Sequence, residues 1–154
     1  MIGRIAPPRD LEGLLDRFTT PDAHGVHALF ETKQKVLMFA AALGRRRGSS
    51  LPLDRKGVAI RYDIFERALD DGFIDALSIA TTDDLKVLSP ERADERIRIF
   101  EEYAHAGLVE MEERCFNQTG DPLEELIAIV DEQRQGPSEG LTGIDPGILS
   151  KLLK

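Results

Sequence analysis

The sequence predicts a mainly α-helical protein, a compact bundle of about five to six helices with a long basic loop and a flexible C-terminal peptide. Apolar residues recur at spacings of three and four along most of the chain, and helix-starting residues precede several of these stretches. Only Val58–Ile60 suggests an extended segment, which is too short to indicate a sheet. A chain of 154 residues with 42% hydrophobic residues fits one domain and needs no disulfide or metal for stability.

The first predicted helix follows Asp10, a residue suited to an N-cap. Its apolar face has the spacing i, i+3, i+4, i+7 that is typical of a helix packed on one side. This face consists of Leu11, Leu14, Leu15 and Phe18.

A second helix is expected from about Ala28 to Leu43, and its broad apolar surface indicates a central, buried position. Gly44 is expected to end it, with three exposed arginines where cations stabilise a helix C-terminus. Between Gly44 and Arg61 lie six basic residues and one acid, Asp54. This segment is therefore predicted to be a basic loop.

Two short helices are predicted next. Asp63 has the position of an N-cap, with Glu66 three residues later as in a capping box. Gly72 interrupts the pattern, and another short helix follows with the apolar residues Phe73, Ile74, Leu77 and Ala80.

Ser89 and Pro90 form a helix start, because serine is a good N-cap and proline is favoured at the first helical position. Gly107 lies inside this helix and is expected to kink or divide it. The apolar stripe of the helix is Ile97, Phe100, Ala104, Leu108, Met111 and Cys115.

Asp121 and Pro122 open the last helix of the predicted domain. Its expected inner face is Leu123, Leu126, Ile127 and Val130. Across the whole bundle, we predict one shared core that contains Phe39, Phe100, Leu108 and Ile127.

The composition changes after Gln135, where glycine, proline and serine are typical of a linker. We therefore expect residues 1–135 to form a single helical domain and residues 136–154 a linker with a short amphipathic segment. A helix of about nine residues is marginal in water, so its apolar face needs a cover. Its own domain, a second copy in a homodimer and a groove on a partner all stay open. The candidate partner-binding residues are Ile148, Leu149, Leu152 and Leu153.

Catalytic motifs are not evident, and we expect no cofactor and no metal. His24 and His27 have a spacing that admits a metal, but the usual second pair of ligands does not accompany them. The adjacent acid pairs, among them Glu101 with Glu102, are typical of a solvated helix face. Cys115, the only cysteine, aligns with apolar residues and is interpreted as a buried structural thiol.

The net charge of −8 argues against general coating of nucleic acid, but the basic segment is a local exception. A cation-decorated helix terminus, a contact with phosphates and a dock for an acidic partner all remain open for it. The candidate nucleic-acid-binding residues are Arg45, Arg46, Arg47, Arg55, Lys56 and Arg61.

Three segments resemble a family of small bacterial proteins encoded beside DNA phosphorothioate-modification (Dnd) operons, the fourth of the Dnd-associated families. They are Glu31–Gly44, Pro52–Phe65 and Arg96–Leu108. The resemblance covers roughly residues 29 to 115 and supplies no catalytic residue. It implies a role in a bacterial defence system that marks DNA with sulfur.

The sequence and this resemblance favour a non-enzymatic accessory protein of a DNA-modification or phage-defence system. It would bind proteins of a modification or restriction complex and, as a second contact, DNA. A small metal-dependent nuclease built from scattered acids is the alternative, and a DNA-binding regulator is a third reading. We expect a cytoplasmic protein, because the chain lacks a run of about 20 apolar residues and an N-terminal h-region.

Overall fold

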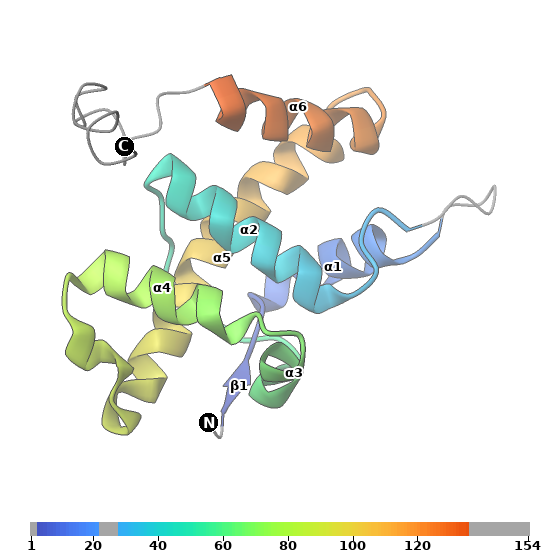
Figure 1. Cartoon of the computed structure of the whole chain (residues 1–154). Coiled ribbons are helices and arrows are strands. Elements are labelled where there is room, and N and C mark those ends of the chain that lie inside the picture. Colours follow the sequence, from blue (N-terminus) through green and yellow to red (C-terminus); the bar gives the residue numbers. More distant parts are fainter. Residues whose placement is uncertain (1–2, 22–27, 136–154) are drawn as a thin grey trace, which may run out of the picture.

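A computed structural model describes residues 3–21 and 28–135, and it confirms the mainly helical fold (Figure 1). Helices α2 and α5 pack against each other at the centre, and the other elements surround them. The elements are β1 (Arg4–Ile5), η1 (Arg9–Leu11), α1 (Glu12–Thr19), α2 (Lys33–Arg47), β2 (Ile60–Arg61), α3 (Tyr62–Arg67), α4 (Asp71–Thr82), η2 (Leu85–Leu88), η3 (Pro90–Arg92), α5 (Ala93–Cys115) and α6 (Pro122–Gln135).

Helix α2 begins later and ends later than predicted. It begins at Lys33 because the Thr32 side chain caps it by accepting a hydrogen bond from the Lys35 amide. It ends at Gly48, which has a φ of 66°, in the left-handed region that favours glycine at a helix C-terminus. The three arginines of the predicted basic loop therefore form the last turn of a helix.

Gly44 does not end α2, because its role is a close approach between helices. A Cβ atom at this position would lie 2.2 Å from the carbonyl oxygen of Tyr103 on α5. The absence of a side chain at Gly44 thus allows the α2 backbone to approach α5.

Gly107 has the same role on the opposite helix, and it does not divide the helix, which the prediction had allowed. Helix α5 continues unbroken from Ala93 to Cys115. A Cβ atom at Gly107 would lie 1.8 Å from the carbonyl oxygen of Ala40 on α2. The two glycines therefore mark the crossing of the central helix pair.

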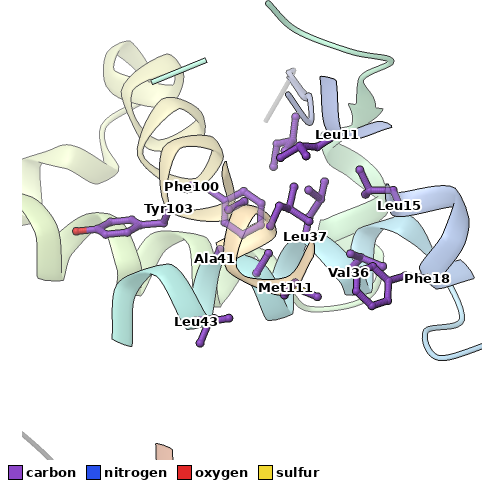
Figure 2. Packing of buried hydrophobic residues seen from close by; sticks show 14 of the residues in the cluster. Leu11, Leu15, Phe18, Val36, Leu37, Ala41, Leu43, Phe100, Tyr103 and Met111 are labelled. Carbon is purple, nitrogen blue, oxygen red and sulfur yellow. The ribbon is translucent and has the colours of Figure 1, made fainter. Parts of the chain in front are cut away.

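The core lies between α1, α2 and α5, where the labelled apolar side chains gather (Figure 2). Phe100 and Leu108 are fully buried in it, as predicted. Phe39 is only partly buried, and Ile127 is 52% exposed, so the prediction for Ile127 is wrong. Leu126 is the one residue of the predicted inner face of α6 that is buried, and Ile129 is buried beside it. Leu123 and Val130 are exposed like Ile127, because the contact face is rotated away from the predicted one.

The N-terminal segment forms a small ribbon with the segment before α3. Strand β1 pairs antiparallel with β2, with Ile5 opposite Ile60. The predicted extended segment therefore pairs with residues far away in the sequence. Asp63 is not the N-cap of α3, which begins one residue earlier at Tyr62; the Asp63 carboxylate accepts hydrogen bonds from Arg61 and Arg67 instead.

Candidate functional site

The last turn of α2 presents Arg45, Arg46 and Arg47, and all three are exposed, as predicted. Each also has a partner on another helix. Arg46 donates a hydrogen bond to the backbone carbonyl of Gln133 on α6, at 2.9 Å. Arg45 contacts the Tyr103 hydroxyl on α5, at 3.3 Å. The arginines therefore connect the end of α2 to α5 and to α6.

Arg47 belongs to an ion-pair network between α2, α5 and α6. Its guanidinium lies 3.0 Å from Glu110 on α5 and 3.0 Å from Glu132 on α6. Arg114 on α5 also binds Glu132, at 2.7 Å. Hydrogen bonds from Arg114 and from Arg47 hold the pKa of Glu132 below its usual value. Glu132 therefore stays ionised and attaches α6 to two arginines.

The pKa of Tyr103 depends on burial and on its contacts with Thr81 and Arg45. Burial raises the pKa of Tyr103, but hydrogen bonds involving Thr81 and Arg45 outweigh the burial, so the pKa lies below its usual value. The hydroxyl thus serves as a polar junction between α4, α5 and the end of α2.

The other three predicted residues contact a different part of the molecule. Arg55 lies 3.2 Å from Asp10, with both side chains exposed, and Arg61 binds Asp63. Lys56 lies 2.8 Å from a carboxylate oxygen of Glu101. The structure therefore divides the six basic residues into two groups with separate partners.

Glu101 is a buried acid that the sequence-based interpretation missed. Its side chain is 2% exposed, whereas the adjacent acid pairs were expected to form a solvated face. One carboxylate oxygen binds Lys56, and the other accepts a hydrogen bond from the Ala6 amide at 2.8 Å. Because Ala6 and Glu101 lie far apart in the sequence, local spacing contains no signal for this contact.

Arg4 joins the second basic group through strand pairing. It lies directly opposite Arg61 in the register of β1 and β2, and both side chains are exposed. Two positive charges directly opposite each other on a ribbon destabilise the strand pair unless an acidic side chain or a bound anion compensates them. Asp63 provides part of that compensation at Arg61.

Exposed apolar side chains lie along α6. Leu123, Ile127 and Val130, at spacings of four and three, are 48%, 52% and 41% exposed. Next to Val130, a hollow of about 350 Å³ separates α6 from α2. Of the three exposed residues, only Val130 lines this hollow, and we use the name α6 groove for the hollow together with the exposed side chains of α6. The hollow is lined by Phe39, Ala42, Leu43, Arg46, Ile129, Val130, Gln133 and Arg134.

The remaining candidates have no assembled site in the described part of the chain. Among residues 3–21 and 28–135, no group of three or more His, Cys, Asp or Glu side chains is arranged to hold a metal ion. Cys115 is buried, and burial raises its pKa to about 11, as expected for a structural thiol. His24, His27 and the predicted partner-binding residues Ile148, Leu149, Leu152 and Leu153 lie outside the described residues.

None of the helices within the described ranges is both long enough and apolar enough to cross a membrane. A protein-family model with the description "DNA sulphur modification system-associated protein 4" matches residues 4–143. This match includes β1 and α6, which lie outside the segments that carried the resemblance in the sequence. No curated protein and no solved structure matches the chain.

Proposed function

The chain belongs to the family of DNA sulphur modification system-associated protein 4, and on this premise we propose that it is an accessory protein that binds another protein of that system. It acts as a binding module and brings no catalytic group of its own. The partner is a protein of the modification or restriction complex.

The observation that carries this proposal is the exposure of Leu123, Ile127 and Val130 along one side of α6. Three large apolar side chains at helical spacing form the kind of surface that receives an amphipathic helix. The hollow beside Val130 offers room for an apolar anchor. The C-terminal residues Ile148, Leu149, Leu152 and Leu153 form the second partner-binding element of this proposal, from their sequence pattern.

Affinity capture from cells that carry the complete DNA sulphur modification system tests the proposal. The full chain should recover a protein of that system, and Ile127→Asp should lose it. Val109→Asp is the matched control, because Val109 is an exposed apolar residue on α5 away from the α6 groove. Equal recovery by Ile127→Asp and the control would remove the groove from the proposal. Failure of the unmodified chain to recover any protein of the system would remove the function.

As a second function we propose contact with DNA through Arg45, Arg46, Arg47, Arg55, Lys56 and Arg61. The exposure of three consecutive arginines at the end of α2 supports it. The opposed pair Arg4 and Arg61 also supports it, because a phosphate would relieve the repulsion between them. The acidic total charge restricts such contact to these two groups.

Fluorescence anisotropy with labelled duplex DNA at low salt tests this second function. Binding should weaken steeply with salt, with a log–log slope of about −0.9 for each phosphate contacted. Replacing all three arginines of α2 with glutamine should abolish binding, but it also removes the contacts that attach α6. The double variant Arg55→Gln, Arg61→Gln avoids this complication, because the ion pairs of these residues are with Asp10 and Asp63 and not with α6. An absence of binding by the unmodified protein would end the DNA hypothesis.

A further inference from the structure

We propose that the partner docks on α6 through an amphipathic helix whose apolar face is bordered by basic side chains. The inference rests on the proposed function and names the chemistry of the partner surface. Of two partner helices with the same apolar face, the chain selects the one edged by lysine or arginine and rejects the one edged by acids.

The first observation is an apolar stripe on the outer side of α6, which lies at the edge of the molecule (Figure 1). Leu123, Ile127 and Val130 are between 41% and 52% exposed, and residues at i, i+4 and i+7 share one face of a helix. The stripe is about 10 Å long, because a helix rises about 1.5 Å per residue. An incoming helix of about two turns therefore covers it, and the hollow beside Val130 has room for one of its side chains.

The second observation is the charge along the outer edge of this stripe. Glu124 and Asp131 each follow a stripe residue by one position, so they lie about 100° around the helix from it. Leu126 and Ile129, which are buried, lie on the opposite side of the stripe. The two exposed carboxylates therefore border the stripe on the side that faces solvent.

These two carboxylates differ from the other acids of α6 in the charges around them. Glu125 and Glu132 both bind Arg114 on α5. By contrast, neither Glu124 nor Asp131 forms an ion pair with another residue of the described ranges. Arg134, the one basic residue of α6, lies in the last turn, beyond the stripe. A helix bound along the stripe thus meets negative charge that α6 itself leaves uncompensated.

The same charges argue against a second copy of this chain as the occupant. In an antiparallel pair of α6 helices related by a twofold axis, the acidic edges of both copies lie on the same side of the interface. Glu124 and Asp131 would then face like charges, which destabilises an interface. A parallel pair would turn each acidic edge toward the body of the other copy. The net charge of −8 adds repulsion between copies and attraction to a basic partner.

Fluorescence anisotropy of the full chain with two labelled designed peptides tests the inference. Both peptides are amphipathic helices of about two heptads with leucine on one face. They differ only in the residues that flank the leucines, which are lysine in one peptide and glutamate in the other. At low salt the chain should bind the lysine peptide at least about tenfold more tightly, and the difference should shrink as added salt screens the charges.

Charge reversal along the edge of the stripe provides the matching variant. Glu124→Lys combined with Asp131→Lys should exchange the preference, so that the glutamate peptide binds more tightly. Asp54→Lys combined with Glu91→Lys is the matched control, because it makes the same change in net charge at exposed positions outside α6. This control should keep the preference of the unmodified chain. Circular dichroism of each variant verifies the fold, and the comparison of the two peptides on the unmodified chain depends on no variant.

Equal affinity for the two peptides, or no binding of either, would overturn the inference. Retention of the preference by the edge variant, or its exchange in the control, would also overturn it, because the selectivity would then come from another surface or from net charge. So would a doubled molar mass of the full chain in light scattering that Ile127→Asp returns to the monomer value, since a second copy would then cover the stripe.

Partner capture by the full chain is a separate measurement from peptide binding. Capture that depends on Ile127, without any preference between the peptides, rejects this inference and leaves the proposed function standing. A preference for the lysine peptide without capture of any protein of the system rejects the proposed function and supports the docking chemistry of α6.

Discussion

At the residue scale, Leu69 is the most unusual side chain of the described structure. It has a φ of 61°, in the left-handed region, and it is 84% exposed. It follows the end of α3, where its amide bonds to the carbonyl of Glu66 and the next amide bonds to that of Phe65. This is the position at which helices commonly end with glycine.

We expect Leu69→Gly to stabilise the protein, by about 1 kcal/mol at most, because the strain of a left-handed leucine is removed and little packing is lost. Urea denaturation measures the change. Leu85→Gly is the control, since Leu85 is also exposed but lies in η2 without a positive φ. That control should lose stability. A loss at Leu69 as large as at Leu85 would show that the leucine side chain has a contact that outweighs the strain.

Gly107 leads to a second prediction at this scale. Gly107→Ala should destabilise the protein by about 1–3 kcal/mol or more, because the new Cβ atom meets the backbone of α2 and the helices have to separate. Gly13→Ala in α1 is the matched control, because a Cβ atom there has no neighbour within 4 Å. Alanine is the better helix former, so the control should gain up to about 1 kcal/mol. Similar changes in the two denaturation midpoints would argue against the close crossing of α2 and α5.

At the element scale, the attachment of α6 depends on ions as much as on apolar contacts. Only Leu126 and Ile129 of α6 are buried, and Glu132 binds Arg114 and Arg47. This combination makes the attachment of α6 sensitive to acid. Because the folded-state pKa of Glu132 is lowered, its contribution is present above the ordinary pKa of glutamate and is lost as the pH falls through the lowered value.

We therefore expect Glu132→Gln to reduce the difference between the urea midpoints measured at pH 7 and at pH 3. The effect should be modest, because the Glu132 side chain is about half exposed and solvent screens the pairs. Glu124→Gln, on the exposed side of the same helix, is the control and should leave this difference unchanged. An unchanged pH dependence in Glu132→Gln would mean that the network contributes nothing to the attachment of α6.

At the scale of the whole molecule, stability centres on the core around Phe100. The Phe100 ring is fully buried and lies 5.8 Å from that of Phe65 and 6.4 Å from that of Phe73, which come from α3 and α4. Phe100→Ala should cost about 3–5 kcal/mol, because it leaves a cavity where three helices meet. Val58→Ala, at an exposed position, should change the unfolding free energy by less than about 0.5 kcal/mol. A comparable loss in the two variants would contradict the placement of Phe100.

The helical class and most element positions could be predicted because they depend on local signals. The stripe of α5 from Ile97 to Cys115 and the start of α6 after Asp121 illustrate this, since a period near 3.6 and a helix-starting pair need no knowledge of the partner helix. Gly44 and Gly107 could not be interpreted in the same way. Glycine signals a helix end, a kink or a close approach, and only the position of the opposite helix distinguishes among them.

The candidate site was less predictable for the same reason. The exposure of the α2 arginines follows from their charge, but their partners Glu110, Glu132 and Gln133 belong to helices distant in the sequence. Helix α6 shows the limit most clearly. Its apolar residues cover a wide arc, and the period alone does not tell which part of an arc faces the core. Ile127 was assigned to the wrong part.

The contact between Ala6 and Glu101 has a consequence for how the protein is made. A ribosome makes residues in sequence order, so Ala6 leaves the exit tunnel long before Glu101 on α5 has been synthesised. Until then the Ala6 amide lacks its carboxylate acceptor, and the pairing of β1 with β2 is the contact that can already form. Residues 4–6 are thus fully secured only after α5 has been made. Ribosome-bound chains that stop before Glu101 should therefore remain sensitive to proteases around residues 4–6, and chains released from the ribosome with α5 complete should become resistant there.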